Sequence, residues 1–105
     1  MAKIKITVVK KLTAEEVFDG EVPKYFPSTF KSPCNMFELE QEFIVEGLQC
    51  PEGFCHWAYA DIHKDLVTIN FNNSDNWYGM TPNWVTCTDG MRPVVFQIER
   101  LEDEK

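Results

Sequence analysis

The chain has 105 residues, enough for one hydrophobic core and too few for two, so we expect a single domain over residues 1–105. Apolar residue types make up 44% of it and include 8 Phe and 3 Trp, a composition that excludes an intrinsically disordered chain. The net charge of -7 argues against a nucleic-acid partner, because an acidic surface repels a phosphate backbone.

The opening residues become polar at once and contain no apolar stretch of the length that a secretory signal needs. No apolar run approaches the roughly 18 residues that cross a bilayer. We therefore expect a cytoplasmic protein without a membrane span. In that reducing compartment, its four cysteines are expected to be buried free thiols, metal ligands or redox thiols instead of disulfides.

The N-terminal segment alternates apolar and polar residues from Lys3 to Val8, a period of two that predicts a half-buried strand. The sequence TAEE at residues 13–16 has the spacing of a capping box, in which the Thr hydroxyl and a Glu carboxylate bind free amides at a helix start. A helix of one or two turns should follow and stop near Gly20.

Three prolines lie between Glu21 and Asn35, and each removes an amide donor and disfavours a helix before it. An irregular connection is predicted, with Tyr25, Phe26 and Phe30 packing onto the body of the domain.

Apolar residues from Phe37 to Val45 then alternate with glutamates and predict a second strand that ends at Gly47. Its alternation is interrupted near Gln41 and Glu42, which indicates a bulge.

Apolar residues recur every three or four positions from His56 to Ile69 and predict the main amphipathic helix. Its tail, residues 67–71, suits a helix or a strand by residue type, and both assignments stay open. A polar loop is expected over residues 72–82, followed by a short strand over 85–87.

Val94, Phe96 and Ile98 alternate on a last strand after a turn. The whole pattern predicts an α+β fold, in which one main helix covers one face of a small, mostly antiparallel sheet and a short helix lies near the N-terminus.

The cysteines occupy boundaries between the predicted elements, at Cys34, Cys50, Cys55 and Cys87. Boundary positions can converge at one edge of a two-layer fold, whereas cysteines in mid-strand would point into the core. A first hypothesis is that Cys34, Cys55 and Cys87 bind zinc or an iron-sulfur cluster, with Cys50 or His56 as a fourth ligand. The spacing matches no strong metal signature, since the chain has no Cys-x2-Cys pair and only one Cys-x4-Cys.

A second hypothesis is a thiol redox enzyme or sensor centred on Cys55. This thiol would lie at the start of the main helix, where the helix dipole and free amides favour a thiolate. Cys50 or Cys87 would serve as the resolving thiol. A third hypothesis treats all four cysteines as small buried apolar residues of an interaction domain.

The histidines and aspartates give weaker indications of a metal site or an active site. His56 and His63 are seven residues apart, too distant on a helix to bind one ion in the i, i+4 manner, and His63 is expected at the surface. Asp61 and Asp65 are expected to form a solvated acidic stripe. No glycine-rich phosphate loop or nucleophile elbow is present, so the familiar enzyme classes gain no support.

Three cysteine-containing segments stand out along the chain: CNMFE from Cys34, GFCHWA around Cys55, and CTDGMRPVVFQIER from Cys87. Together they resemble a family of small, uncharacterised bacterial and archaeal proteins, over nearly the whole chain. The resemblance implies no established activity. It implies that these three cysteines match the positions of the family, while Cys50 is an extra one.

The chain also departs from this family. Relatives usually have proline where Asn35 and His56 stand here. A proline at position 56 would suit the first turn of a helix and supports Cys55 as its N-cap. The same departure weakens His56 as a shared ligand, and leaves solvent, a substrate or Cys50 as the fourth partner of a three-thiol site.

Overall fold

The computed structural model describes residues 3–71 and 82–101. The elements in chain order are β1 (Lys3–Lys11), α1 (Ala14–Val17), a 3-10 turn η1 (Ser28–Phe30), β2 (Glu42–Glu46), α2 (His56–Asn70), β3 (Asn83–Thr86) and β4 (Val94–Leu101).

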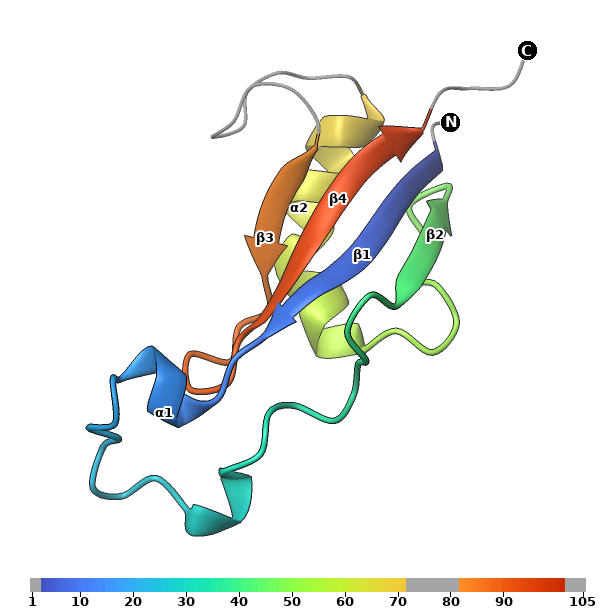
Figure 1. Cartoon of the computed structure of the whole chain (residues 1–105). Coiled ribbons are helices and arrows are strands. Elements are labelled where there is room, and N and C mark those ends of the chain that lie inside the picture. The colour runs from blue at the N-terminus through green and yellow to red at the C-terminus, as the bar shows by residue number, and fades with distance from the viewer. Residues whose placement is uncertain (1–2, 72–81, 102–105) are drawn as a thin grey trace.

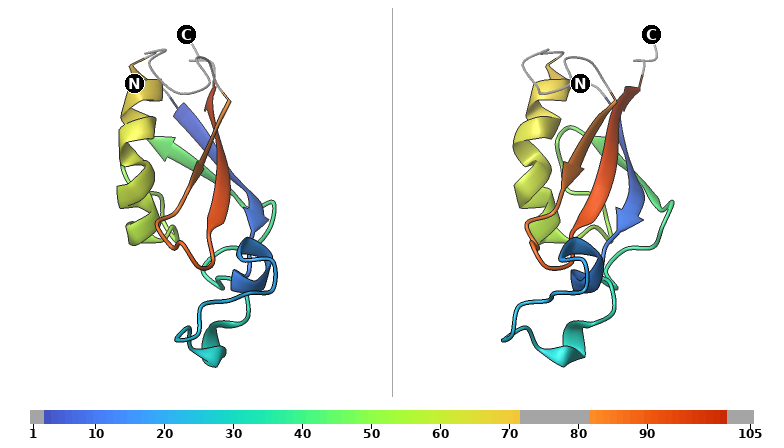
Figure 2. Two further views of the ribbon diagram at one scale, coloured as in Figure 1. Left: turned by 90° about the vertical axis from the view of Figure 1, so that its left-hand side faces the viewer. Right: turned by 60° about the vertical axis from the view of Figure 1, so that its left-hand side comes forward.

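The strands form one antiparallel sheet in the order β2-β1-β4-β3. Figure 1 looks onto this sheet with α2 behind it, and Figure 2 shows α2 covering one face only. The predicted α+β fold is therefore confirmed. None of the helices in the described residues is long and apolar enough to span a membrane.

The period of two along β1 produces the core directly. Ile4, Ile6 and Val8 are fully buried against the helix. Lys5, which points to the other face, lies 3.8 Å from the Glu42 carboxylate and 3.7 Å from that of Glu99 on the neighbouring strands. The uncovered face of the sheet is thus charged, and the covered face is apolar.

Aromatic rings dominate the core at the end of the sheet where β1 ends and β4 begins. The ring of Phe37 lies 5.0 Å from that of Phe54 and 5.1 Å from that of Phe96, measured between centroids, in edge-to-face contacts. Phe43 completes this cluster, 4.9 Å from Phe54. This aromatic cluster packs the segment before β2 and the turn before α2 against the sheet.

The short N-terminal helix follows the predicted capping box. The Glu16 amide donates to the Thr13 hydroxyl, and the Thr13 amide donates to the Glu16 carboxylate at 2.9 Å. This amide, followed by the Thr13 hydroxyl, lowers the pKa of the Glu16 carboxyl. The helix ends at Val17, sooner than Gly20 alone suggested.

The open question about residues 67–71 is settled in favour of a helix, since α2 continues to Asn70. The Arg100 guanidinium donates to the carbonyl oxygens of Ile69 and Asn70, both at 2.9 Å, and so satisfies carbonyl groups that a helix end leaves free. Of the predicted loop over residues 72–82, only Pro82 lies within the described residues.

The second strand is shorter than predicted and covers only Glu42–Glu46. Phe37 is buried as expected, but it lies outside any strand, and a turn follows it at Leu39 and Glu40. The irregularity lies at Glu40 and Gln41: the Val8 amide donates to the Gln41 carbonyl at 2.9 Å, and the Glu40 amide donates to the Val8 carbonyl at 2.7 Å. Glu40 and Gln41 thus both pair with Val8, which is the two-to-one pairing of a β-bulge. Glu40 adopts a φ of 68°.

Because a left-handed φ is strained for any residue with a Cβ, Glu40→Gly is expected to stabilise the fold by up to about 1 kcal/mol. Glu38→Gly is the matched control, since Glu38 is also exposed but is not among the residues with positive φ. It should destabilise slightly, because glycine loses more conformational freedom on folding. Urea unfolding of both variants checks this, and a Glu40→Gly variant no more stable than Glu38→Gly contradicts it.

Residues 12–36 form an arm that projects beyond the end of the sheet (Figure 1). The predicted packing of its aromatic residues onto the body is wrong for Tyr25, whose side chain is 89% exposed. Phe26 and Phe30 pack on each other within the arm, 6.2 Å between ring centroids. The prolines thus produced the irregular path that was expected, but the path leads away from the core.

Candidate functional site

All four cysteines are free and partly buried, and all four pack against the same hydrophobic core. Cys55 directly precedes α2 and Cys87 directly follows β3, and these two ends lie at the same end of the sheet (Figures 1 and 2). The Thr88 amide, next to Cys87, donates to the Asp61 carboxylate on α2 at 2.7 Å. The Thr88–Asp61 hydrogen bond therefore joins the end of β3 to α2, while the convergence of the cysteines themselves stays a prediction.

The proposed metal ligands were Cys34, Cys55 and Cys87, with Cys50 or His56. All five residues are described, and His56 is exposed. Within the described ranges, no three His, Cys, Asp or Glu side chains are arranged so that they could hold a metal ion. The metal hypothesis, with these five residues as ligands, stays a prediction.

Cys50 and Cys55 lie on the two sides of a reverse turn. The turn runs from Pro51 to Phe54 and is closed by the Phe54 amide, which donates to the Pro51 carbonyl at 3.1 Å. The Cys50 thiol donates to the carbonyl oxygen of Pro51 at 3.7 Å and to that of Phe54 at 3.9 Å. Since Phe54 directly precedes Cys55, the sulfur of Cys50 lies near the backbone next to Cys55.

Cys55 is the N-cap residue of α2, as predicted from the sequence. Its backbone is extended, with φ -65° and ψ 122°, and its side chain makes no capping hydrogen bond. The sulfur therefore lies at the helix start but accepts no hydrogen bond from the amides of the first turn. These amides form the positive end of the helix dipole.

Tyr59 lies one helical turn after Cys55 and fixes the loop that carries Cys50. Its hydroxyl donates to the carbonyl oxygen of Leu48. Burial, followed by the charge of Cys50, raises the pKa of the Tyr59 hydroxyl, so Tyr59 keeps its proton and remains a donor. Cys50, Cys55 and Tyr59 together form what we call the thiol cluster.

The surroundings of the Cys50 thiol change its pKa. Burial is the main cause that raises the pKa of the Cys50 thiol, and a negative charge on Cys55 raises it further. Cys50 is therefore held in the protonated form, which agrees with its role as a hydrogen-bond donor to the turn.

The rate of Cys50 alkylation should consequently rise only at a higher pH than the rate of an unperturbed thiol, because the thiolate is the reactive form. Cys55→Ser removes the neighbouring charge and should shift the Cys50 profile to lower pH, although burial keeps it above the ordinary range. Cys34→Ser is the control and should leave the profile unchanged. Iodoacetamide labelling followed by peptide mass spectrometry measures both profiles. An identical Cys50 profile in the wild-type chain and in Cys55→Ser would rule out the coupling.

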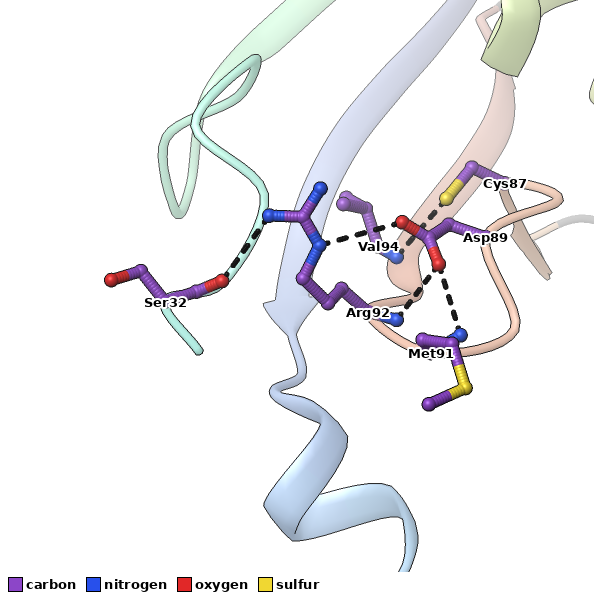
Figure 3. Close-up of polar contacts among 6 residues, drawn as sticks. All are labelled: Ser32, Cys87, Asp89, Met91, Arg92 and Val94. Carbon is purple, nitrogen blue, oxygen red and sulfur yellow. Dashed lines mark hydrogen bonds and ion pairs between the residues drawn. The ribbon is translucent and has the colours of Figure 1, made fainter. Parts of the chain in front are cut away.

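The turn after β3 holds Cys87 in a defined position (Figure 3). The Val94 amide donates to the Cys87 sulfur at 3.4 Å. The Asp89 carboxylate accepts hydrogen bonds from the amides of Met91 and Arg92, at 2.9 and 3.0 Å, and so organises the turn between β3 and β4. Cys87 is thus part of a turn that its own hydrogen bonds organise.

Arg92 connects this turn to the end of the arm that carries Cys34. Its Nε lies 3.5 Å from the Asp89 carboxylate, and its guanidinium donates to the Ser32 carbonyl at 3.3 Å (Figure 3). It also lies over the ring of Phe30, 4.8 Å from the centroid. The sequence motif around Cys87 therefore has a structural function that its cysteine alone did not suggest.

Two contacts were missed from the sequence. Asp61 is half-buried and accepts the Thr88 hydrogen bond, so the prediction of a solvated stripe is wrong at this position. Tyr59 was taken only as part of the apolar helix stripe, although its spacing of four from Cys55 places both on one helix face. His63 is exposed, as predicted.

No family model matches the chain, and no curated protein or solved structure matches it either. The resemblance to the prokaryotic family therefore stays a prediction.

Proposed function

We propose that the protein undergoes thiol-disulfide exchange at Cys50 and Cys55. The observation that carries this proposal is the turn that brings the Cys50 sulfur to 3.9 Å from the carbonyl oxygen of Phe54, the residue bonded to Cys55. A short turn between two cysteines supports this proposal, because it keeps their backbones near each other, as an intramolecular disulfide requires. The reducing cytoplasm, where we expect the protein to work, keeps such a pair as dithiols until an oxidant arrives.

In the proposed exchange, the Cys55 thiolate attacks one sulfur of a substrate disulfide, forms a mixed disulfide and expels the other half as a thiolate. Cys50 then gives up its proton to solvent and attacks the Cys55 sulfur. This step releases the second half of the substrate and leaves a Cys50–Cys55 disulfide. Two electrons pass to the substrate, and two protons end on its released thiols.

The roles of the two thiols follow from their surroundings. Cys50 is held protonated by burial and by its neighbour, so it suits the second, resolving attack. Cys55 lies at the helix start with a side chain free of capping bonds, so it suits the first attack. Tyr59 keeps the loop between β2 and α2 in place through Leu48.

The test is a thiol count in the native protein, purified without oxygen and equilibrated with mixtures of reduced and oxidised glutathione. We expect two of the four thiols to disappear together, reversibly and with the protein remaining folded. Metal content is measured on the same sample. Stoichiometric zinc or iron that is lost in Cys55→Ala would contradict the redox proposal in favour of a metal centre. Four unreactive thiols would contradict it in favour of purely structural cysteines.

A further inference from the structure

Tyr59 contacts both of the segments that carry the cysteines of the thiol cluster. Its backbone amide donates to the Cys55 carbonyl at 2.9 Å, the hydrogen bond that closes the first turn of α2. Its side-chain hydroxyl donates to the carbonyl oxygen of Leu48, which lies two residues before Cys50. One residue thus joins the start of the helix to the loop before it. We call these two bonds the Tyr59 clamp.

The ring of Tyr59 is also held against the turn between the two cysteines. It packs on the ring of Phe54 in an edge-to-face contact, with 6.3 Å between the centroids. Phe54 is 3% exposed and belongs to the aromatic cluster of the core. The core and α2 therefore set the position of the Tyr59 hydroxyl, and the loop is bound to that position.

The loop needs this support at Leu48. Gly47 and Leu48 are the central residues of a turn in which the Gln49 amide donates to the Glu46 carbonyl at 3.3 Å. Both adopt a positive φ, of 62° and 58°. A positive φ is ordinary for glycine and disfavoured for leucine, so contacts from outside the turn have to hold Leu48 in it. The Tyr59 hydroxyl supplies such a contact.

The Tyr59 hydroxyl and the Cys50 thiol are close enough to influence each other. After burial, the charge of Cys50 is the second cause that raises the pKa of the Tyr59 hydroxyl. The hydroxyl therefore keeps its proton when Cys50 becomes a thiolate, and it still donates to the Leu48 carbonyl. The Tyr59 clamp stays closed in the state in which Cys50 attacks.

We infer that Tyr59 is the positioning residue of the resolving step, and that its hydroxyl sets how fast a mixed disulfide at Cys55 becomes a Cys50–Cys55 disulfide. The inference rests on the proposed thiol-disulfide exchange. In this step Cys50 loses its proton to solvent, its sulfur attacks the Cys55 sulfur, and the substrate leaves as a thiolate. The rate of such an intramolecular attack depends on how well the loop holds Cys50 beside Cys55. The first attack, by Cys55 on the substrate disulfide, does not depend on the loop.

Tyr59→Phe tests the inference by removing the hydroxyl alone. Phenylalanine keeps the ring on Phe54 and the amide bond to the Cys55 carbonyl. The reduced, full-length chain is mixed with oxidised glutathione and quenched with acid at increasing times, and intact-mass spectrometry quantifies the mixed and the internal disulfide. We expect the conversion of the mixed to the internal disulfide to be roughly threefold to tenfold slower in Tyr59→Phe, the factor that one net hydrogen bond supplies.

Two controls separate this role from a general effect on the fold. Cys50→Ser and Cys50→Ser/Tyr59→Phe lack the resolving thiol and should form the mixed disulfide at Cys55 at equal rates. Thr68→Val removes another hydroxyl from α2, one that donates to the Lys64 carbonyl at 3.0 Å, and should leave both steps unchanged.

The possible results distinguish this inference from the proposed exchange. A Tyr59→Phe chain that converts the mixed disulfide as fast as the wild-type chain would overturn the role of Tyr59 and leave the exchange standing. Equal slowing in Thr68→Val, or a slower first step in Cys50→Ser/Tyr59→Phe, would overturn it as well, because the effect would then come from a weakened helix. A wild-type chain that forms no internal disulfide would refute the exchange itself and the role of Tyr59 with it.

Discussion

Cys55→Ser is expected to abolish the reversible two-electron oxidation of the protein. Serine keeps the N-cap position of α2 and removes the sulfur that begins the exchange. After equilibration with oxidised glutathione, the wild-type chain should lose two thiols, whereas the variant should form no intramolecular disulfide. The oxidised fraction, measured by alkylation and intact-mass spectrometry, should fall from nearly complete to none.

Cys50→Ser separates the two steps of the exchange. Without the resolving thiol, the reaction should stop at a mixed disulfide between Cys55 and one glutathione. Cys34→Ser is the control and should oxidise like the wild-type chain, since Cys34 lies at the end of the arm and not at the turn. If Cys55→Ser still loses two thiols together, another pair carries the chemistry.

Phe96→Ala is expected to give the largest loss of stability. Phe96 is fully buried, and its ring contacts those of Phe37 and Phe54 in the cluster that joins the sheet to the turn before α2. Removing a buried phenyl ring costs about 3–5 kcal/mol, a large part of the roughly 5–15 kcal/mol that stabilises a small domain. Urea unfolding followed by circular dichroism measures the difference.

Phe71→Ala serves as the matched control, because its side chain is 68% exposed. Its free energy of unfolding should stay within about 0.5 kcal/mol of the wild-type value. If Phe96→Ala does not fold at all, Phe96→Leu gives the same comparison with a smaller loss. Equal stabilities for the Phe96 and Phe71 variants would contradict the position of this cluster in the core.

The fold was predictable where a regular period coincides with burial. The alternation in β1 and the three-to-four spacing in α2 each produced one buried face, and the two faces meet to form the core. The capping box was predictable because its bonds join residues only three apart. In these elements, local preference and tertiary packing agree.

The segment before β2 could not be assigned in the same way. Phe37 and Leu39 alternate with glutamates as in a strand, but Leu39 is 57% exposed and the chain there is a turn. Phe37 precedes that turn and lies in no strand, and it is buried because its ring reaches the aromatic cluster. Alternation alone does not distinguish such a side chain from one in a strand.

The thiol cluster was only partly predictable. The sequence placed Cys55 at the helix start, but it left Cys50 and Cys87 as alternatives for the second thiol. The contact from Tyr59 to Leu48 depends on the loop conformation, in which Leu48 adopts a φ of 58°. Apolar residues rarely adopt a left-handed φ, so the sequence gives no sign of it. The direction of the arm could not be predicted from the sequence either. It depends on the contacts of Arg92 with the Ser32 carbonyl and the Phe30 ring.

The most direct test of the redox proposal is a disulfide map of the wild-type protein. The chain is oxidised with glutathione disulfide, alkylated without reduction, cleaved with a protease and sequenced by tandem mass spectrometry. We predict a single intramolecular bond that joins Cys50 to Cys55, with Cys34 and Cys87 recovered as alkylated thiols. A bond that involves Cys34 or Cys87, or recovery of Cys50 and Cys55 without any link, would contradict it.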